Sequence, residues 1–589
     1  MKSLSYLNKY LFKYKWRLIL GVIFITASNF FGVEMPRIVK KAVDLFESKI
    51  ESIKNSGVND VDQIDILDTA FYLALIYIGI SLLRGFFVFL NRQTIIIMSR
   101  LIEYDLKNEI YSHYQKLSPA FYKNNNTGDL MNRISEDVSK VRMYLGPAIM
   151  YSINLLVLSV LTIYYMVSVN LELTLYALAP LPIMTIMIYY ISRVMNQRSE
   201  EVQRQQSIVS TFVQESFSGI RVVKAYNMQK SLSNSFLNEV DGFKDKSMKL
   251  ATINAFFFPV IVLLIGASTI LTIYIGGIKA NAGEITNGDI AAFVIYVNML
   301  TWPFASIGWV TSMVQRAAAS QTRINEFLKQ EPDIFSKEGA VDMKGGDIIF
   351  KNASFVYPDS GIKAMENVSF TLKEGTTLGI IGETGSGKST IANMIARLYD
   401  VTSGEVRIGN NTITDIDLTQ LRKSIGYVPQ DSFLFSNSIA NNIKFGLSEL
   451  DSTSDEKMIQ AAKDAHIYTN IMDFDKGFET IVGERGITLS GGQKQRVSIA
   501  RAIIKHPDIL IFDDCLSALD TETESIILNN LKRIMKGKTS VIISHRVSSL
   551  EHADLILVMN EGKVIEQGTH EQLLARGGYY SSLNEKQRG

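Results

Sequence analysis

The first half of the chain is dominated by long apolar runs that lack the polar position in every turn expected of a helix on the surface of a water-soluble bundle. Six such runs lie near 18–40, 69–92, 147–168, 173–195, 254–278 and 288–312. A helix of about 20 residues crosses roughly 30 Å of hydrocarbon, so each run is long enough to span a bilayer. The pattern therefore predicts a membrane domain of six transmembrane helices.

The charges that flank the first run predict its orientation. Lys and Arg residues gather before it, over 2–17, whereas Asp and Glu residues predominate after it, over 44–68. Because cytoplasmic flanks carry the excess of Lys and Arg, the N-terminus is expected in the cytoplasm. Six crossings return the chain to the same side. We therefore expect a multi-pass protein of the cell membrane whose C-terminal part is also cytoplasmic.

Two connections between the runs, 93–146 and 196–253, are long, charged and compatible with helix. By parity both lie on the cytoplasmic side, so the membrane helices are expected to continue beyond the bilayer as stalks. Pro119 and Gly219 interrupt the two connections. Each break either presents a short helix to a cytoplasmic partner or is an ordinary surface turn.

Composition changes after the sixth run. We place a membrane domain at 1–330, a polar linker at 331–347 and an α/β domain at 348–589, where strand-like runs alternate with helical ones. The net charge of +1 argues against a nucleic-acid-binding surface, which is normally basic. A single cysteine, Cys515, excludes an intramolecular disulfide. No cleaved signal peptide is expected, because the first run is long and meets no small-residue cleavage pattern before Pro36.

The α/β part contains a phosphate-binding loop. The run from Gly382 to Ser389 reads G-E-T-G-S-G-K-S, follows an apolar strand and precedes a helix-compatible stretch. Glycines let backbone N–H groups surround phosphate oxygens, Lys388 supplies a charge to the β- and γ-phosphates, and the Ser389 hydroxyl can bind Mg²⁺. The motif therefore predicts an ATP site that uses Mg²⁺.

A second apolar strand, Ile509 to Asp513, ends in the carboxylate that normally completes such a site. Asp513 is expected to hold Mg²⁺ beside Ser389. Asp514 follows where a carboxylate could orient or activate the attacking water. By themselves, two aspartates at the end of a strand could equally serve a turn or cap a helix.

Between these strands, a serine and glycine turn opens an amphipathic helix. Its sequence is Leu489, Ser490, Gly491, Gly492 and Gln493. A helix N-terminus is a second receptor for phosphate. One ATP does not need two such receptors within a single chain, so this segment is expected to complete a site on another subunit.

These motifs, in this order, resemble those of half-transporters in the ATP-binding-cassette exporter family, and the resemblance covers nearly all 589 residues. It implies that Tyr357 stacks on adenine, that Gln430 touches Mg²⁺ and couples to the membrane domain, and that His545 responds to the γ-phosphate. Taken singly, each of these three residues would be unremarkable. The resemblance implies an ATP-binding set of Tyr357, Gly382, Glu383, Thr384, Gly385, Ser386, Gly387, Lys388, Ser389 and Thr390.

The resemblance extends to six other segments. Ser517, Ala518, Leu519 and Asp520 match the loop that meets the opposite site, and Glu484 and Arg485 match an exporter-specific loop. In the membrane half, Phe121 to Arg133 and the segment around Gly219 resemble the two intracellular coupling loops. Trp302 with Pro303, and Ala319 to Ile324, also match the exporter pattern.

One position departs from the family. Most members carry glutamate directly after the strand-end aspartate, but this chain has Asp514. The resemblance therefore implies a half-transporter whose catalytic residues are Asp514, His545 and Gln430, with a heterodimer slightly favoured over a homodimer. The expected activity is ATP-driven export or flipping of a hydrophobic or amphipathic substrate by alternating access. An ATP-gated channel or a regulator on the same frame is the alternative.

Arg84 is the candidate substrate contact. Counted from the ends of the apolar runs, it lies deeper from the outer surface than Glu34, so the two are not expected to pair. An arginine within a membrane is expected to face a bundle interior or an aqueous cavity, where it could meet an anionic group. Pairing with another helix is the structural alternative.

Overall fold

The computed structural model describes residues 2–56, 60–447, 453–483, 489–516 and 521–588. Contacts divide the chain into two compact units. Unit 1 comprises Met1–His113 and Gly128–Lys329, and unit 2 comprises Tyr114–Thr127 and Gln330–Gly589. A short piece of the first long connection therefore clusters with the C-terminal part of the chain.

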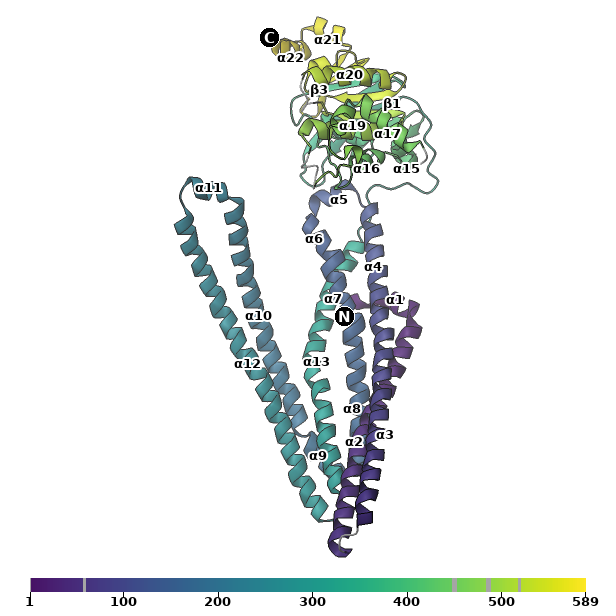
Figure 1. The fold of residues 1–589 in the computed structure, drawn as a ribbon. Helices are drawn as coiled ribbons and strands as arrows, with labels where there is room; N and C mark the ends of the chain where they lie inside the picture. The colour runs from purple at the N-terminus through teal and green to yellow at the C-terminus, as the bar shows by residue number, and fades with distance from the viewer. Residues whose placement is uncertain (1, 57–59, 448–452, 484–488, 517–520, 589) are drawn as a thin grey trace. The chain divides into compact units, whose positions relative to one another are not determined.

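Helices make up almost all of unit 1 (Figure 1). From the N-terminus to Leu328, the helical elements are η1 (Lys2–Leu7), α1 (Asn8–Lys13), α2 (Lys15–Ser56), α3 (Asp60–Asn91), η2 (Arg92–Ile96), α4 (Ile97–Lys116), α5 (Pro119–Asn124), α6 (Thr127–Asn132), η3 (Arg133–Asp137), α7 (Val138–Met143), η4 (Tyr144–Ala148), α8 (Ile149–Val169), α9 (Leu171–Leu178), α10 (Pro180–Ser218), α11 (Ile220–Ala225), α12 (Gln229–Asn281) and α13 (Asn287–Leu328).

Six helical stretches are long and apolar enough to cross a membrane. They are Lys15–Glu51, Leu67–Lys116, Thr127–Val169, Leu171–Ser218, Gln229–Asn281 and Asn287–Leu328. Each contains one predicted span, and the helices that flank the two long connections continue well beyond their spans, as expected for stalks. The expected breaks also occur, because α4 ends before Pro119 and α10 ends before Gly219.

The first connection is largely helical. The acidic stretch 44–68 links the first two spans, and within it α2 runs on to Ser56 and α3 begins at Asp60. Residues 41–56 contain neither glycine nor proline, so nothing in this stretch ends the helix once it has left the apolar run. Both helices of this hairpin therefore extend beyond their apolar runs.

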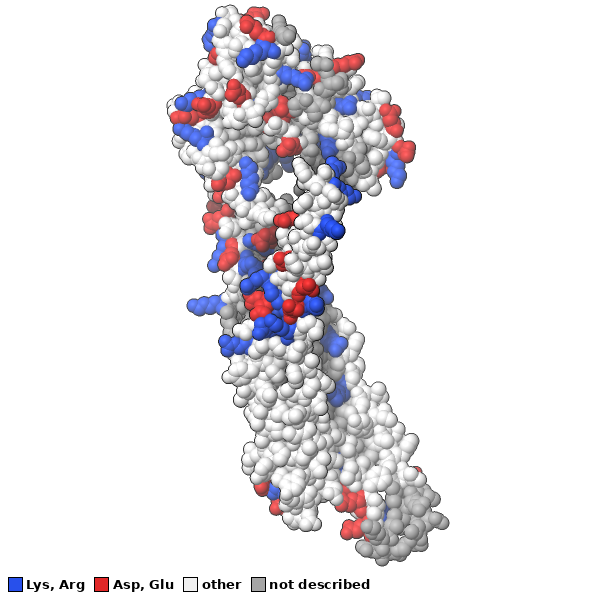
Figure 2. Space-filling view, turned by 90° about the vertical axis from the view of Figure 1, so that its left-hand side faces the viewer, with Lys and Arg blue, Asp and Glu red and all other residues white. Residues whose placement is uncertain are grey.

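Apolar side chains face outward along the membrane helices. None of the most apolar 18 residues of α3 is buried, and Phe71 and Leu82 are 66% and 70% exposed. Figure 2 shows a band of unit 1 almost free of charged residues, bordered by Lys, Arg, Asp and Glu side chains. Exposed apolar surface on this scale is typical of helices that contact lipid.

Helices α10 and α12 form a long antiparallel pair joined by α11. In Figure 1 the pair lies near α13 at its α9 end and leans away from α13 toward α11. No described residue of α11 is buried. The short helix after Gly219 therefore has no covering partner within unit 1.

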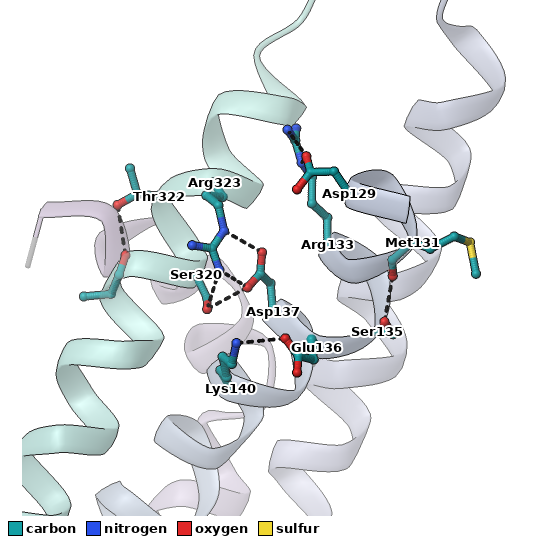
Figure 3. Close-up of polar contacts among 11 residues, drawn as sticks. Asp129, Met131, Arg133, Ser135, Glu136, Asp137, Lys140, Ser320, Thr322 and Arg323 are labelled. Carbon is teal, nitrogen blue, oxygen red and sulfur yellow. Dashed lines mark hydrogen bonds and ion pairs between the residues drawn. The ribbon is translucent and has the colours of Figure 1, made fainter. Parts of the chain in front are cut away.

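A buried carboxylate ties the end of α13 to the first long connection (Figure 3). Asp137 accepts hydrogen bonds from Ser320 Oγ at 2.8 Å and from Arg323 Nε at 2.9 Å, and a second guanidinium nitrogen of Arg323 also donates to it. Its side chain is 4% exposed, against 47% for Arg323. We call these three residues the Asp137 clasp.

Unit 2 is built on two sheets. The larger has strand order β10-β9-β3-β8-β7-β6, with all neighbours parallel except β10 and β9, and the smaller is antiparallel with order β2-β1-β4-β5. The strands are β1 (Ile348–Val356), β2 (Lys363–Leu372), β3 (Thr377–Gly382), β4 (Ser403–Ile408), β5 (Asn411–Thr412), β6 (Ile425–Val428), β7 (Ile509–Asp513), β8 (Thr539–Ile543), β9 (Leu555–Asn560) and β10 (Lys563–Gly568).

Helices complete unit 2. They are α14 (Lys388–Ile395), η5 (Ile413–Asp415), α15 (Leu418–Ser424), α16 (Ile439–Lys444), α17 (Ser454–Asp464), α18 (Tyr468–Met472), η6 (Gly477–Glu479), α19 (Gly491–Ile503), α20 (Thr521–Met535), η8 (Val547–Ser549), α21 (His570–Arg576) and α22 (Tyr579–Arg588). Residues of α16, α17, α18 and α19 share one apolar core with β7. The predicted fold class, six membrane helices followed by an α/β ATPase with a helical subdomain, is confirmed.

Candidate functional site

The loop between β3 and α14 is shaped by glycines that no other residue can replace. Gly387 has φ +94°, and a Cβ there would lie 2.1 Å from the carbonyl oxygen of Ala364. A Cβ on Gly382 would lie 2.1 Å from the carbonyl oxygen of Met559. Both approaches are far inside van der Waals contact, so the loop depends on glycine at both positions.

The ammonium group of Lys388 and the hydroxyl group of Ser386 are both buried within the loop. Lys388 Nζ donates to the carbonyl oxygens of Gly382 at 2.9 Å and Glu383 at 2.6 Å. Burial lowers the pKa of Lys388, and the negative charges of Asp514 and Asp513 partly offset that fall. Ser386 Oγ is buried without a hydrogen-bond partner among the described residues. A phosphate group in the loop would give Lys388 a partner of opposite charge.

The two aspartates after β7 lie in different environments. Asp513 is 3% exposed and accepts a hydrogen bond from Ser389 Oγ at 2.9 Å. Burial raises the pKa of Asp513, and the hydrogen bond from Ser389 opposes that rise. Asp514 has φ +45°, and its N–H donates to the carbonyl oxygen of Ile543 at 2.9 Å. Aspartate tolerates this left-handed conformation better than most residues.

A cavity of about 280 Å³ gathers most of the predicted site residues. Those that line it are Tyr357, Thr384, Gly385, Gly387, Lys388, Ser389, Thr390, Gln430, Asp513, Asp514 and His545. We call it the phosphate-loop cavity. Gly382, Glu383 and Ser386 belong to the same loop but do not line this cavity. The paired Ser389 and Asp513 oxygens, with Gln430 beside them, are a donor set that suits Mg²⁺.

Tyr357 lines the phosphate-loop cavity next to other aromatic residues. Its hydroxyl shares a hydrogen bond with Thr390 Oγ1 at 3.2 Å. Its ring meets Phe355 and Tyr399 edge to face, with centroids 4.8 Å and 5.5 Å away. The Tyr399 contact could not be recognised in the sequence, because it joins aromatic residues 42 positions apart, one directly after β1 and the other shortly after α14.

His545 and Gln430 reach the cavity from loops that follow β8 and β6. The backbone oxygen of His545 accepts a hydrogen bond from Gln587 Nε2 at 2.7 Å, and Gln587 Oε1 accepts one from the N–H of Val547 at 2.8 Å. Gln587 thus positions the His545 loop from the last helix of the chain. Gln587 could not be recognised as a site residue from the sequence, because nothing in its neighbourhood resembles a motif.

The segment Leu489 to Gln493 lies apart from the phosphate-loop cavity and begins α19. Ser490 caps the helix: its Oγ accepts from the N–H of Gln493 at 3.3 Å, and Gln493 Oε1 accepts from the N–H of Ser490 at 2.9 Å. Ser517, Ala518, Leu519 and Asp520, with Glu484 and Arg485, lie outside the described residues.

Arg501, in the last turn of α19, is a second residue that no sequence motif marks. It donates three hydrogen bonds at 2.8 Å, to the carbonyl oxygens of Asn442 and Phe433 and to Asn442 Oδ1. Burial lowers the pKa of Arg501 to about 10. Because Phe433 lies shortly after Gln430, Arg501 joins α19 to the loop that carries Gln430.

Arg84 occupies a different depth from the one predicted. A Cβ on Gly32 would lie 3.2 Å from Arg84 Nε, and Arg84 Nη1 approaches Met35 Sδ at 3.8 Å, so Arg84 lies level with the turn of α2 that contains Glu34. The ends of the apolar runs do not mark the depth of Arg84, because α2 runs on to Ser56 and α3 begins at Asp60.

Even at similar depth, Arg84 and Glu34 form no ion pair among the described residues. Glu34 instead pairs with Arg37 at 2.9 Å and accepts a hydrogen bond from Tyr165 at 2.7 Å. Arg84 lies in unit 1 and takes no part in the phosphate-loop cavity.

Comparison with known proteins accounts for both units. The family model described as the ABC transporter transmembrane region matches residues 18–304, and the model described as ABC transporter matches residues 365–517. The solved structure of a bacterial Atm1-family ABC exporter with ATP bound superposes with a TM-score of 0.79 at 25% identity, covering 98% of each chain.

Two curated relatives match along nearly their whole length. The probable multidrug resistance ABC transporter ATP-binding/permease protein YheI of Bacillus subtilis is 36% identical over 98% of this chain and 96% of its own. The multidrug resistance-like ATP-binding protein MdlA of Escherichia coli is 32% identical over 100% and 97%. These similarities do not favour the alternative of a channel or regulator. The chain belongs to the ATP-binding-cassette exporter family, as a multi-pass membrane protein that couples ATP hydrolysis to export.

Proposed function

We propose that this chain is one half of a dimeric exporter of the cell membrane, with its N-terminus and its ATPase in the cytoplasm, that moves a hydrophobic or amphipathic substrate outward by alternating access. A heterodimer is slightly favoured over a homodimer. One observation supports a dimer in particular: Ser490 and Gly492 do not line the chain's own phosphate-loop cavity. A second subunit would bring these residues to the ATP bound here, and this chain would do the same for its partner.

The short helix α11 supports a partner as well. Val222 and Tyr226, in and directly after α11, are 61% and 76% exposed. Apolar side chains at the tip of a long helical pair, outside any bilayer-length apolar run, favour docking on another protein surface. The partner's ATPase unit is the surface we propose.

Each chain would bind one ATP in its phosphate-loop cavity. Tyr357 would stack on the adenine, and the N–H groups of the loop and Lys388 Nζ would hold the phosphates, releasing the carbonyl oxygens that Lys388 now contacts. Ser389, Asp513 and Gln430 would hold Mg²⁺, which supplies charge neutralisation between the β- and γ-phosphates. Asp514 would accept a proton from the attacking water, and His545 would contact the γ-phosphate.

Asp514 is the reason for favouring a heterodimer. Aspartate is one methylene shorter than glutamate, which leaves its carboxylate roughly 1.5 Å farther from a water that a general base must approach within about 3.2 Å. A misplacement of that size costs around a hundredfold in rate. The chain's own site would then be slow, while its intact Leu489 to Gln493 segment serves a faster site on a diverged partner.

The substrate class is supported by a cavity of about 400 Å³ between α10 and α13 in unit 1. Ile188, Tyr189 and Phe304 offer apolar surface, while Ser192, Arg193 and Glu200 offer hydroxyl and charged groups. A cavity that mixes these two kinds of surface suits an amphipathic molecule. Arg84 remains a second candidate contact, for an anionic group.

The test is to purify this chain alone, reconstitute it in liposomes, and measure ATPase rate and uptake of an amphipathic dye into inverted vesicles. We expect a slow ATPase that Asp514→Glu accelerates and Asp514→Asn does not. A homodimer with substantial activity that Asp514→Asn abolishes would contradict the slow-site proposal. ATP-dependent current without directional dye uptake would contradict export.

A further inference from the structure

The short helix α5, in the connection between the second and third spans, is anchored on the ATPase fold at its first turn. Ala120 is 8% exposed and belongs to the apolar core that contains β1 and β3. Just before it, Ser118 Oγ donates to Asp333 Oδ2 at 2.9 Å. Proline at the first helical position sets the start of the helix. These contacts at the start of α5 fix the position of its last turn, which follows directly.

Lys123 lies in that last turn and reaches the aromatic cluster around Tyr357. Its Nζ is 4.5 Å from the ring centroid of Tyr357 and 5.7 Å from that of Tyr399. Both distances are within the range of a cation–π contact. Among the described residues Lys123 forms no ion pair with a carboxylate. The contacts of its ammonium group are therefore those with the rings of Tyr357 and Tyr399.

Lys123 approaches Tyr357 from outside the phosphate-loop cavity. It lines a separate cavity of about 670 Å³, together with Lys116, Tyr122 and Leu398. Tyr357 lines the phosphate-loop cavity, whereas Lys123 does not. A base stacked on Tyr357 and the ammonium group of Lys123 can therefore contact the same ring at once.

We propose that Lys123 is a positioning residue for the adenine base: it holds the Tyr357 ring from α5 and so links occupancy of the base site to the connection between the second and third spans. The proposal rests on the proposed role of Tyr357. A cation–π contact shifts an equilibrium by roughly 2- to 30-fold, depending on its desolvation. Linkage is reciprocal. If the contact of Lys123 with the Tyr357 ring strengthens binding of the base, then binding of the base strengthens that contact by the same factor.

The test uses the full-length purified chain in nanodiscs and two probes, ATP and inorganic tripolyphosphate, which lacks a base. Lys123→Met keeps the apolar stem and removes the charge. We expect it to weaken ATP binding about 3- to 10-fold, with tripolyphosphate binding unchanged. Lys116→Met, in the same cavity but away from Tyr357, is the matched control and should leave both unchanged.

A double-mutant cycle with Tyr357→Leu decides the mechanism. If Lys123 acts through the ring, Lys123→Met has no further effect on ATP binding in the Tyr357→Leu background. Unchanged ATP affinity in Lys123→Met, a gain in affinity, an equal loss for tripolyphosphate, or additive effects in the double variant would each overturn the proposal. If Tyr357→Leu alone leaves ATP affinity intact, the proposed adenine contact fails first, and the role of Lys123 falls with it.

Discussion

The Asp137 clasp gives the most direct test of how unit 1 is held together. Replacing Asp137 with Asn removes one charge from a side chain that is 4% exposed and leaves its shape unchanged. Hydrogen bonds to a charged group contribute about 1.5–3 kcal/mol each, but Arg323 is 47% exposed, so its share must be discounted toward the 0–1 kcal/mol of a surface pair. Ser320 can still donate to the amide oxygen. We therefore expect a loss of about 1–3 kcal/mol.

The assay is thermal unfolding of the purified chain in detergent, followed by intrinsic fluorescence. In a unit of this size, a loss of about 1–3 kcal/mol corresponds to a fall in Tm of roughly 2–6 °C. Glu136→Gln is the control, because Glu136 is the neighbouring carboxylate and its pair with Lys140 at 3.0 Å is solvent-exposed. That variant should stay within about 0.5 kcal/mol of the parent.

A second variant tests whether the clasp itself is responsible. If Asp137→Asn acts by losing Arg323, adding Arg323→Gln should change Tm little further, because the two groups share one interaction. Fully additive losses would refute the clasp as the cause. So would a Tm for Asp137→Asn equal to that of the Glu136→Gln control.

Three further predictions follow from single positions. Gly387→Ala should lower the free energy of unfolding by more than about 3 kcal/mol, because its Cβ would lie 2.1 Å from a backbone oxygen. Gly385→Ala, with φ +82° and no atom within 4 Å of its Cβ, should lower it by only about 1–2 kcal/mol through backbone strain. Equal Tm values for the two variants would contradict this difference. Asp513→Asn should raise the Tm of the nucleotide-free protein in EDTA, because burial disfavours its charged form, and should abolish stabilisation by Mg-ATP; a lower Tm in EDTA would count against the argument. Arg84→Ala should impair transport of an anionic amphiphile; intact transport with a lowered Tm would assign Arg84 a structural role instead.

The local motifs could be recognised in the sequence because their physics is local. A glycine loop between a strand and a helix specifies backbone N–H groups around an anion within eight residues, from Gly382 to Ser389. An apolar run specifies a span by its length alone. Pro119 and Gly219 end helices through their own backbones, and the structure has helix ends at both. For these features no distant residue has to be known.

Contacts between distant residues were decided only by the tertiary structure. Asp137 meets Ser320 across 183 positions, and Lys123 meets Tyr357 across 234, so no window of sequence contains either pair. The depth of Arg84 depended on how far α2 continues beyond its apolar run, and α2 reaches Ser56 because residues 41–56 contain neither glycine nor proline. Side chains that act through one another across the fold are positioned by packing, and packing is a property of the whole chain.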